Sequence, residues 1–214
     1  MARAVREAAR YCLSFTAAGL MPELAAVMAR IHAETGNWKE TRALVLERNA
    51  LQTRSLASAK RLETELRQRL QLLSDEQLKL LAEGSSDDRL AMAWLAVLQR
   101  IQLTMELTRD LLLNKLEGSD PLLRRSDMTG FYEASEQLHP ELQALSVSSQ
   151  KKVRSTVLSM LREAGLLEGK TSRSGQIGTV QRPSLSPHAL ALIGDDLDLR
   201  AGFLLKPKQR RARR

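Results

Sequence analysis

Hydroxyl, amide and basic side chains are concentrated between residues 148 and 155. The set comprises Ser148, Ser149, Gln150, Lys151, Lys152, Arg154 and Ser155. Short hydroxyls and the free amides at the start of a helix can bind phosphate, whereas Lys, Arg and Gln side chains can reach the edges of DNA bases. The segment is therefore a candidate recognition helix for duplex DNA. The alternative is the solvated face of an ordinary helix.

The local charge supports the hypothesis of a recognition helix. Between residues 148 and 182 there are seven basic residues (151, 152, 154, 162, 170, 173 and 182) against two acidic ones (163 and 168), a surplus of +5. Arg173 lies in the Ser- and Gly-containing stretch KTSRSGQ, which is typical of a mobile loop. We expect Arg173 to support the contacts of the helix.

A second basic group lies earlier in the chain and comprises Arg54, Ser58, Lys60 and Arg61. Arg54, Ser58 and Arg61 follow one another at four- and three-residue steps, so one helix face can present all three. Glu63 and Glu65 follow closely and can pair within the helix with Arg67 and Arg69. A DNA contact and a purely structural surface are both open for this group.

The net charge of the whole chain says less than these local patterns. The formal charge is +8, but residues 206–214, KPKQRRARR, contain six basic and no acidic residues, which leaves +2 for residues 1–205. We expect residues 200–214 to form a flexible basic tail. Such a tail can hold any polyanion without specificity, and it competes with the helix as an explanation of DNA binding.

Other kinds of site are disfavoured. The segment 165–171, GLLEGKT, is similar to a phosphate-binding loop, but it has three residues between its glycines where the motif needs four, and a helix is expected before it. His32, His139 and His188 lie far apart without metal-ligand spacing, and Cys12 is the single cysteine. The sequence therefore predicts no cofactor, no metal and no enzyme activity.

Composition favours a mainly α fold in a cytoplasmic protein. The chain has 214 residues, of which 43% are hydrophobic, 27% charged and only 3% aromatic, and helix-forming residues dominate. A single cysteine fits a reducing compartment. No stretch approaches the roughly 18 uncharged residues of a membrane span, so no membrane association is expected.

Hydrophobic periodicity predicts a helical bundle over residues 1–117. Helices are expected over 22–36, from Asn37, over 50–73, over 74–84, and from a cap at Ser86-Asp87-Asp88 to Leu116 with a break near residues 100–102. The last of these is apolar almost all around, which places it in the middle of the bundle. Residues 117–121, EGSDP, are the expected linker.

A second unit is predicted over residues 121–195. Its helices are expected after a cap at Ser126, from Pro140, and from Ser146 to a stop at Gly165, the order of a helix-turn-helix. Short strands at 166–168 and 177–181 would add a wing. A last short helix is expected from Ser186-Pro187, and residues after Arg200 are expected to be loosely held.

Three blocks of sequence resemble the BrxA family of bacteriophage-exclusion (BREX) defence systems. They are SFTAAGL (14–20), LQTRSLASAKRLETELRQRLQLLSDEQLKLLAEG (51–84) and HPELQALSVSSQKKVRSTVLSMLREAGLLE (139–168), in this order. The resemblance implies a small, mostly helical DNA-binding accessory protein. Its amino-terminal bundle would be similar to NusB-type antitermination factors and would pack with helix-turn-helix elements.

The same resemblance implies a setting of partners. An adenine methyltransferase, an ATPase and a phosphatase-like protein would be encoded nearby, and double-stranded DNA would be the ligand. A monomer or weak dimer is expected. The alternative is a scaffold that holds the defence proteins together, with nucleic acid bound only non-specifically by the tail. The nearly neutral body of residues 1–205 favours that alternative.

Overall fold

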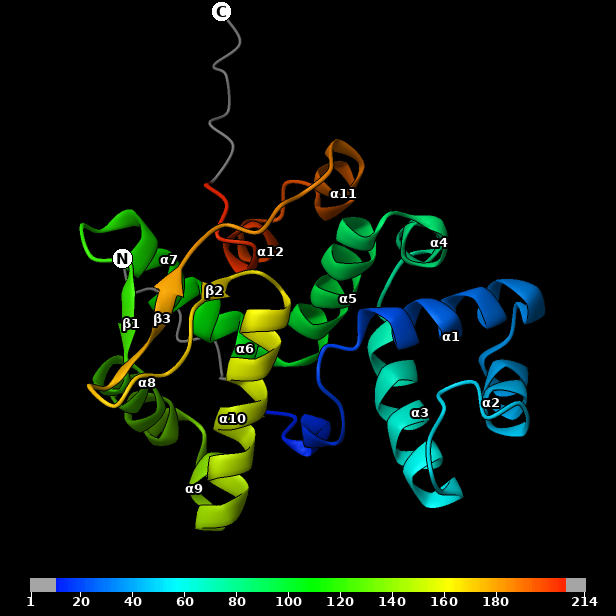
Figure 1. Ribbon diagram of the computed structural model, residues 1–214, viewed down its shortest axis with the longest axis horizontal. Helices are drawn as coiled ribbons and strands as arrows, with labels where there is room; N and C mark the ends of the chain where they lie inside the picture. Colours follow the sequence, from blue (N-terminus) through cyan, green and yellow to red (C-terminus); the bar gives the residue numbers. More distant parts are fainter. Residues whose placement is uncertain (1–10, 207–214) are drawn as a thin grey trace, which may run out of the picture.

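Helices make up most of the protein in the computed structural model, which describes residues 11–206 (Figure 1). The mainly α class is confirmed, and a small three-stranded sheet completes the fold. Among the helices of residues 11–206, none is both long enough and apolar enough to cross a membrane.

The first part of the chain forms a bundle of amphipathic helices. Its elements are the 3-10 helix η1 (Ser14–Ala17), α1 (Pro22–Thr35), α2 (Trp38–Glu47), α3 (Leu56–Leu70), α4 (Asp75–Glu83) and α5 (Ser86–Arg100). The predicted cap at Asn37 is confirmed, since its side chain accepts from the amide of Lys39. Ser74 and Gln77 cap α4 reciprocally, which satisfies two amides that the helix leaves free.

Two predicted helix starts are wrong. The helix expected over 50–73 begins only at Leu56, because Ser55 accepts from the amide of Ser58 and caps it. Arg54 therefore lies in the bend before α3. The cap of α5 is Ser85, which exchanges hydrogen bonds with Asp88, and Ser86 is the first helical residue.

Helix α5 forms the centre of the core, as its apolar residues predict. Residues 91–98 are buried without exception, because α1, α3, α4, α11 and α12 all pack on this helix. The predicted break is confirmed at Ile101, after which the chain continues as α6 (Gln102–Glu106), the π-helix η2 (Leu107–Leu112) and α7 (Leu113–Glu117).

The second part of the chain combines three helices with the sheet. Its elements are β1 (Leu122–Arg124), α8 (Arg125–Leu138), α9 (Pro140–Gln143), α10 (Val147–Glu163), β2 (Leu167–Glu168) and β3 (Gln176–Val180). Strand β3 lies in the middle, antiparallel to both neighbours, with Leu123 opposite Gly178 and Leu167 opposite Val180. A Cβ on Gly178 would lie 2.4 Å from the carbonyl oxygen of Glu168, so the close approach of β2 requires glycine there.

Strand β1 was not predicted, and it changes the start of α8. Three residues are too few to show an alternating pattern, so only pairing with β3 identifies the strand. The cap expected at Ser126 is wrong, because the helix begins at Arg125. Asp127 supplies the cap by accepting from the amide of Arg124 at 2.8 Å.

The carboxyl-terminal helices return to the bundle. Helices α11 (Pro187–Ile193) and α12 (Leu197–Gly202) pack on α5, although α11 lies within the range 121–195 of the predicted second unit. Phe203 and Leu204 are 1% and 0% exposed, and the Trp94 indole donates to the carbonyl of Gly202 at 3.0 Å. The expectation that the chain is loosely held from residue 200 is therefore wrong for residues 200–205. Residues 207–214 of the basic tail lie outside the described residues.

A buried arginine fixes the segment that precedes α1. Arg69 of α3 is 2% exposed, and its Nε donates to Glu65 at 2.9 Å. The two terminal nitrogens donate to the carbonyls of Gly19 (2.7 Å), Ala18 (3.2 Å) and Phe15 (3.5 Å). Burial lowers the pKa of Arg69, and the charge of the Glu65 carboxylate opposes that shift.

Removing Arg69 should strongly destabilise the protein. Arg69→Met leaves the Glu65 charge buried without its partner and the carbonyls of Ala18 and Gly19 without the donor that Arg69 supplies, which we expect to lower the free energy of unfolding by about 3–5 kcal/mol. Urea denaturation measures this change. The control is Arg61→Met on the exposed side of the same helix, for which a change within about 0.5 kcal/mol is expected. Equal stability of the two variants would contradict the role given to Arg69.

Candidate nucleic-acid interface

Helix α10 presents the predicted recognition segment. Ser146 caps the helix by accepting from the amide of Ser149, and Val153, Val157 and Leu161 are buried. Met160 is buried as well, whereas Leu158 is half-buried. With this register, Lys151 and Lys152 are exposed near the amino-terminal end of the helix.

The hydroxyl and amide groups of the segment are largely engaged within the protein. Ser148 and Ser149 both share hydrogen bonds at 3.0 Å with the Ser146 hydroxyl. Gln150 donates to the carbonyl of Leu142 at 3.4 Å, and Ser155 donates to the carbonyl of Lys152 at 3.0 Å. These side chains stabilise the start of α10. Within residues 11–206, the ammonium groups of Lys151 and Lys152 have no such hydrogen bond.

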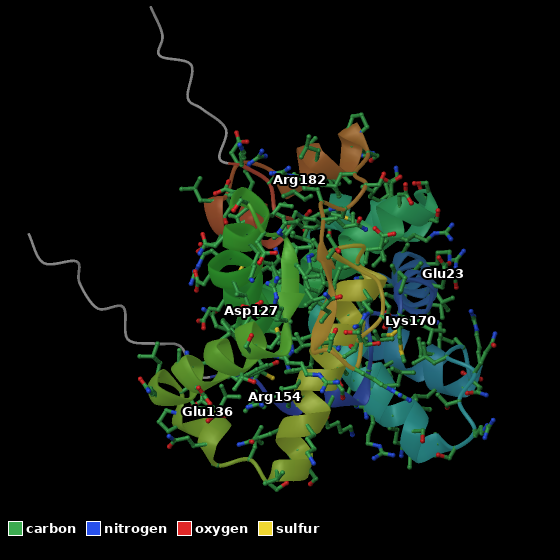
Figure 2. The ribbon with its side chains drawn as sticks, turned by 60° about the vertical axis from the view of Figure 1, so that its left-hand side comes forward. Glu23, Asp127, Glu136, Arg154, Lys170 and Arg182 are labelled. Carbon is green, nitrogen blue, oxygen red and sulfur yellow. The ribbon has the colours of Figure 1, made fainter. Side chains whose placement is uncertain are left out.

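Arg154 faces helix α8. Its guanidinium lies 4.5 Å from the ring centroid of Tyr132 and 3.4 Å from the carboxylate of Glu136 (Figure 2). Burial raises the pKa of the Tyr132 phenol, so the ring stays neutral beneath the cation. Arg154 thus joins α8 to α10, a role that helical periodicity alone did not reveal.

The loop between β2 and β3 is held by another arginine of α10. Arg162 donates to the carbonyl of Gly169 at 3.2 Å, to the hydroxyl of Thr171 at 3.1 Å and to the carbonyl of Ile177 at 3.1 Å. Lys170 and Arg173 are exposed on the same loop. The loop is therefore anchored at its base while its cations face solvent.

The seven basic residues between 148 and 182 divide into two groups. Arg154 and Arg162 hold neighbouring elements, and Arg182 donates to the carbonyl of Leu204 at 2.9 Å. Within residues 11–206, neither an ion pair nor a side-chain hydrogen bond engages the other four, which are Lys151, Lys152, Lys170 and Arg173. All four belong to α10 or to the loop that α10 anchors, and their charged ends are free to meet phosphate.

The second predicted group is only partly on one helix face. Arg54 precedes α3, and the Ser58 hydroxyl accepts from Ser55, whereas Lys60 and Arg61 are exposed on α3. The predicted intrahelical pairs are confirmed, with Arg67 2.7 Å from Glu63 and Arg69 2.9 Å from Glu65.

Sequence reasoning missed a joint around His139. This residue is 2% exposed, its ring stacks on Tyr11 at 3.5 Å, and its two nitrogens lie 3.6 Å from Glu106 and Glu141. The Tyr11 hydroxyl donates to Glu106, and burial with this carboxylate raises the pKa of the phenol. The joint ties residue 11, α6 and the α8–α9 turn together, over separations in sequence that no local pattern could show.

The described residues show no metal centre. In the range 11–206 no three His, Cys, Asp or Glu side chains are grouped so that they could hold a metal ion. The segment 165–171 begins at Gly165, which has a left-handed φ of +71°, and continues into β2 and the loop. It has no helix after it that could supply the amides of a phosphate-binding loop.

Stability measurements should separate the joining arginine from the free lysines. Arg154→Ala removes a cation–π contact and a half-exposed ion pair, and should lower the free energy of unfolding by about 1 kcal/mol. Lys151→Ala and Lys152→Ala should each change it by less than about 0.5 kcal/mol. Urea denaturation of the three variants tests this division, and a lysine variant that destabilises as much as Arg154→Ala would contradict it.

Comparison with solved structures finds the same fold in another protein. A crystal structure of an uncharacterized protein from Magnetospirillum magneticum superimposes with a TM-score of 0.76 at 17% sequence identity, covering 92% of this chain and 98% of that one. No curated protein matches the sequence.

A comparison with protein families finds a match that covers most of the chain. The sequence profile of the BrxA family matches residues 9–194, a range that includes the bundle, α10 and the β2–β3 loop. The three blocks at 14–20, 51–84 and 139–168 all lie inside this range. The chain belongs to the BrxA family.

Proposed function

We propose that this protein is a non-catalytic, DNA-binding accessory component of a bacteriophage-exclusion system. Membership of the BrxA family supports the association with BREX. The observation that carries the DNA hypothesis is the group of four exposed cations, Lys151, Lys152, Lys170 and Arg173, that neither an ion pair nor a side-chain hydrogen bond engages within residues 11–206. Unneutralised Lys and Arg side chains bind DNA phosphates and release condensed counterions.

The order of elements supports a winged-helix mode of binding. Helices α8, α9 and α10 are followed by β2 and β3, and β1 joins the same sheet. In this mode α10 enters the major groove, with Lys151 and Lys152 at its leading end, and the β2–β3 loop meets the adjacent backbone through Lys170 and Arg173. Arg154 and Arg162 act as positioning residues, since they fix α10 to α8 and to the loop.

A scaffold function is the second candidate, and exposed apolar residues favour it. Leu138 at the end of α8 and Val147 at the start of α10 are each 68% exposed. They flank α9, where another protein of the defence system could pack. Recovery of a partner by pull-down from cells that carry the neighbouring genes would support this function, and a loss of that partner with Leu138→Ser would locate it.

A salt titration tests the proposed DNA interface. Each phosphate contact contributes about 0.9 to the slope of log affinity against log salt, so Lys151→Ala/Lys152→Ala should lower the slope by up to ~1.8. The matched control is Lys39→Ala/Lys79→Ala, which removes two exposed lysines from α2 and α4 and should leave the slope unchanged. Fluorescence anisotropy with a labelled duplex measures both.

A deletion of residues 207–214 separates the tail from the interface. The deletion keeps Lys206, whose carbonyl accepts from Arg200 at 3.0 and 3.1 Å. We expect it to weaken binding to all duplexes about equally. If the deletion abolishes binding while Lys151→Ala/Lys152→Ala matches the intact protein at every salt concentration, the proposed interface is wrong and the tail explains the binding.

A further inference from the structure

A hollow lies between η1 and α3, outside the interface proposed above. Its volume is about 370 Å³, and its lining comprises Ser14, Ala17, Lys60, Arg61, Thr64, Glu65 and Gln68. Two cations, the Glu65 carboxylate and several hydroxyl or amide groups therefore surround one concave surface. This combination suits a phosphate group, which takes hydrogen bonds as well as charge.

The cations of the hollow are free because the acidic residues of α3 are occupied. Arg61 would ordinarily pair with Glu65 one turn later, but Glu65 is 4% exposed and bound to Arg69. Glu63 is buried and contacts Arg67 at 2.7 Å and Arg42 at 3.5 Å. Lys60 has Thr64 one turn later, so neither Lys60 nor Arg61 has an ion-pair partner within residues 11–206.

The hollow lies next to α10. Helix η1 packs on α3 on one side and on α10 on the other, and the amino-terminal ends of α3 and α10 point toward the same end of the molecule (Figure 1). Lys60 and Arg61 lie in the amino-terminal half of α3, and Lys151 and Lys152 lie near the start of α10. Helix η1 thus lies between the two helices that carry these cations.

The connection between the two sides is built from buried and hydrogen-bonded groups. Arg69 holds the carbonyls of residues 15, 18 and 19 against α3, and the amide of Leu20 donates to Glu163 of α10 at 3.1 Å. A second phosphate contact made on such a fixed frame orders little additional chain, so most of its interaction energy appears as affinity.

We propose that the hollow lined by Lys60 and Arg61 binds the phosphate backbone of the same duplex that α10 contacts, so that the bundle is part of the DNA-binding surface. This inference rests on the proposed function. The DNA footprint then extends beyond α10 and the β2–β3 loop, across η1 to α3. The exposed hydroxyl of Ser14 adds a neutral donor at the rim.

The test compares Lys60→Ala/Arg61→Ala with a matched control, Arg30→Ala/Lys39→Ala, which removes one exposed Arg and one exposed Lys from α1 and α2. Both are made in the full chain. With a duplex of about 24 base pairs, the first variant should lower the salt slope by up to ~1.8, which corresponds to a roughly 12-fold smaller loss of affinity between 50 and 200 mM salt. The control should titrate like the intact protein.

A quadruple variant provides the second arm. Combining Lys60→Ala/Arg61→Ala with Lys151→Ala/Lys152→Ala should lower the slope on the same duplex by the sum of the two effects.

The outcomes distinguish the inference from the function on which it rests. If Lys151→Ala/Lys152→Ala lowers the slope and Lys60→Ala/Arg61→Ala does not, the bundle does not contact DNA and only this inference is overturned. If neither variant lowers it, or the intact protein does not bind duplex DNA, both fall. Loss of a defence-protein partner from Lys60→Ala/Arg61→Ala, with the salt slope unchanged, would assign the hollow to an acidic protein segment instead.

Discussion

The guanidinium of Arg69 is the constraint on which the arrangement of this protein depends. A buried arginine is tolerated only when its charge is paired and its donors are satisfied. Glu65 supplies the charge, but a single carboxylate cannot accept from all the nitrogens, and the carbonyls of residues 15, 18 and 19 complete the set. The chain before α1 is held against α3 for this reason. Because the next amide, that of Leu20, donates to Glu163, the same segment also fixes the position of α10.

This arrangement gives a physical meaning to the three blocks that resemble the BrxA family. Residues 14–20 supply the carbonyls, residues 51–84 supply Glu65 and Arg69, and residues 139–168 supply Glu163. None of these blocks contains a recognisable catalytic motif, and each looks diffuse in the sequence. In space they meet at one joint, and His139 with Tyr11 forms a second joint at the other end of the same segment. What the blocks share is the task of holding the bundle and α10 together.

The sequence predicted those features that short stretches of chain decide. Asn37, Ser74, Ser146 and Gly165 mark helix ends correctly, because a cap needs only the residues next to it. Features decided by distant contacts were missed. Strand β1 exists because β3 pairs with it, residues 200–205 are ordered because α5 and α6 cover them, and Arg154 faces inward because Tyr132 lies one helix away. The sequence therefore located the segment that carries the candidate DNA contacts, but it could not distinguish the residues that hold the structure together from those that are free to bind DNA.

The distinction between structural and free basic residues matters because only unneutralised cations attract a polyanion strongly. An arginine beside a carboxylate contributes a dipole whose field falls off quickly, whereas a free lysine keeps its full charge within a Debye length of about 8 Å at physiological salt. The surplus of +5 between residues 148 and 182 is thus an incomplete description, since Arg154 is paired with Glu136. Arg162 and Arg182 keep their charge, but their guanidinium groups are held in place by backbone carbonyls. On α3 the same distinction leaves more free positive charge than the sequence indicates. In the sequence its two glutamates offset the basic face, but in the structure both are buried against Arg67 and Arg69, which leaves Lys60 and Arg61 free.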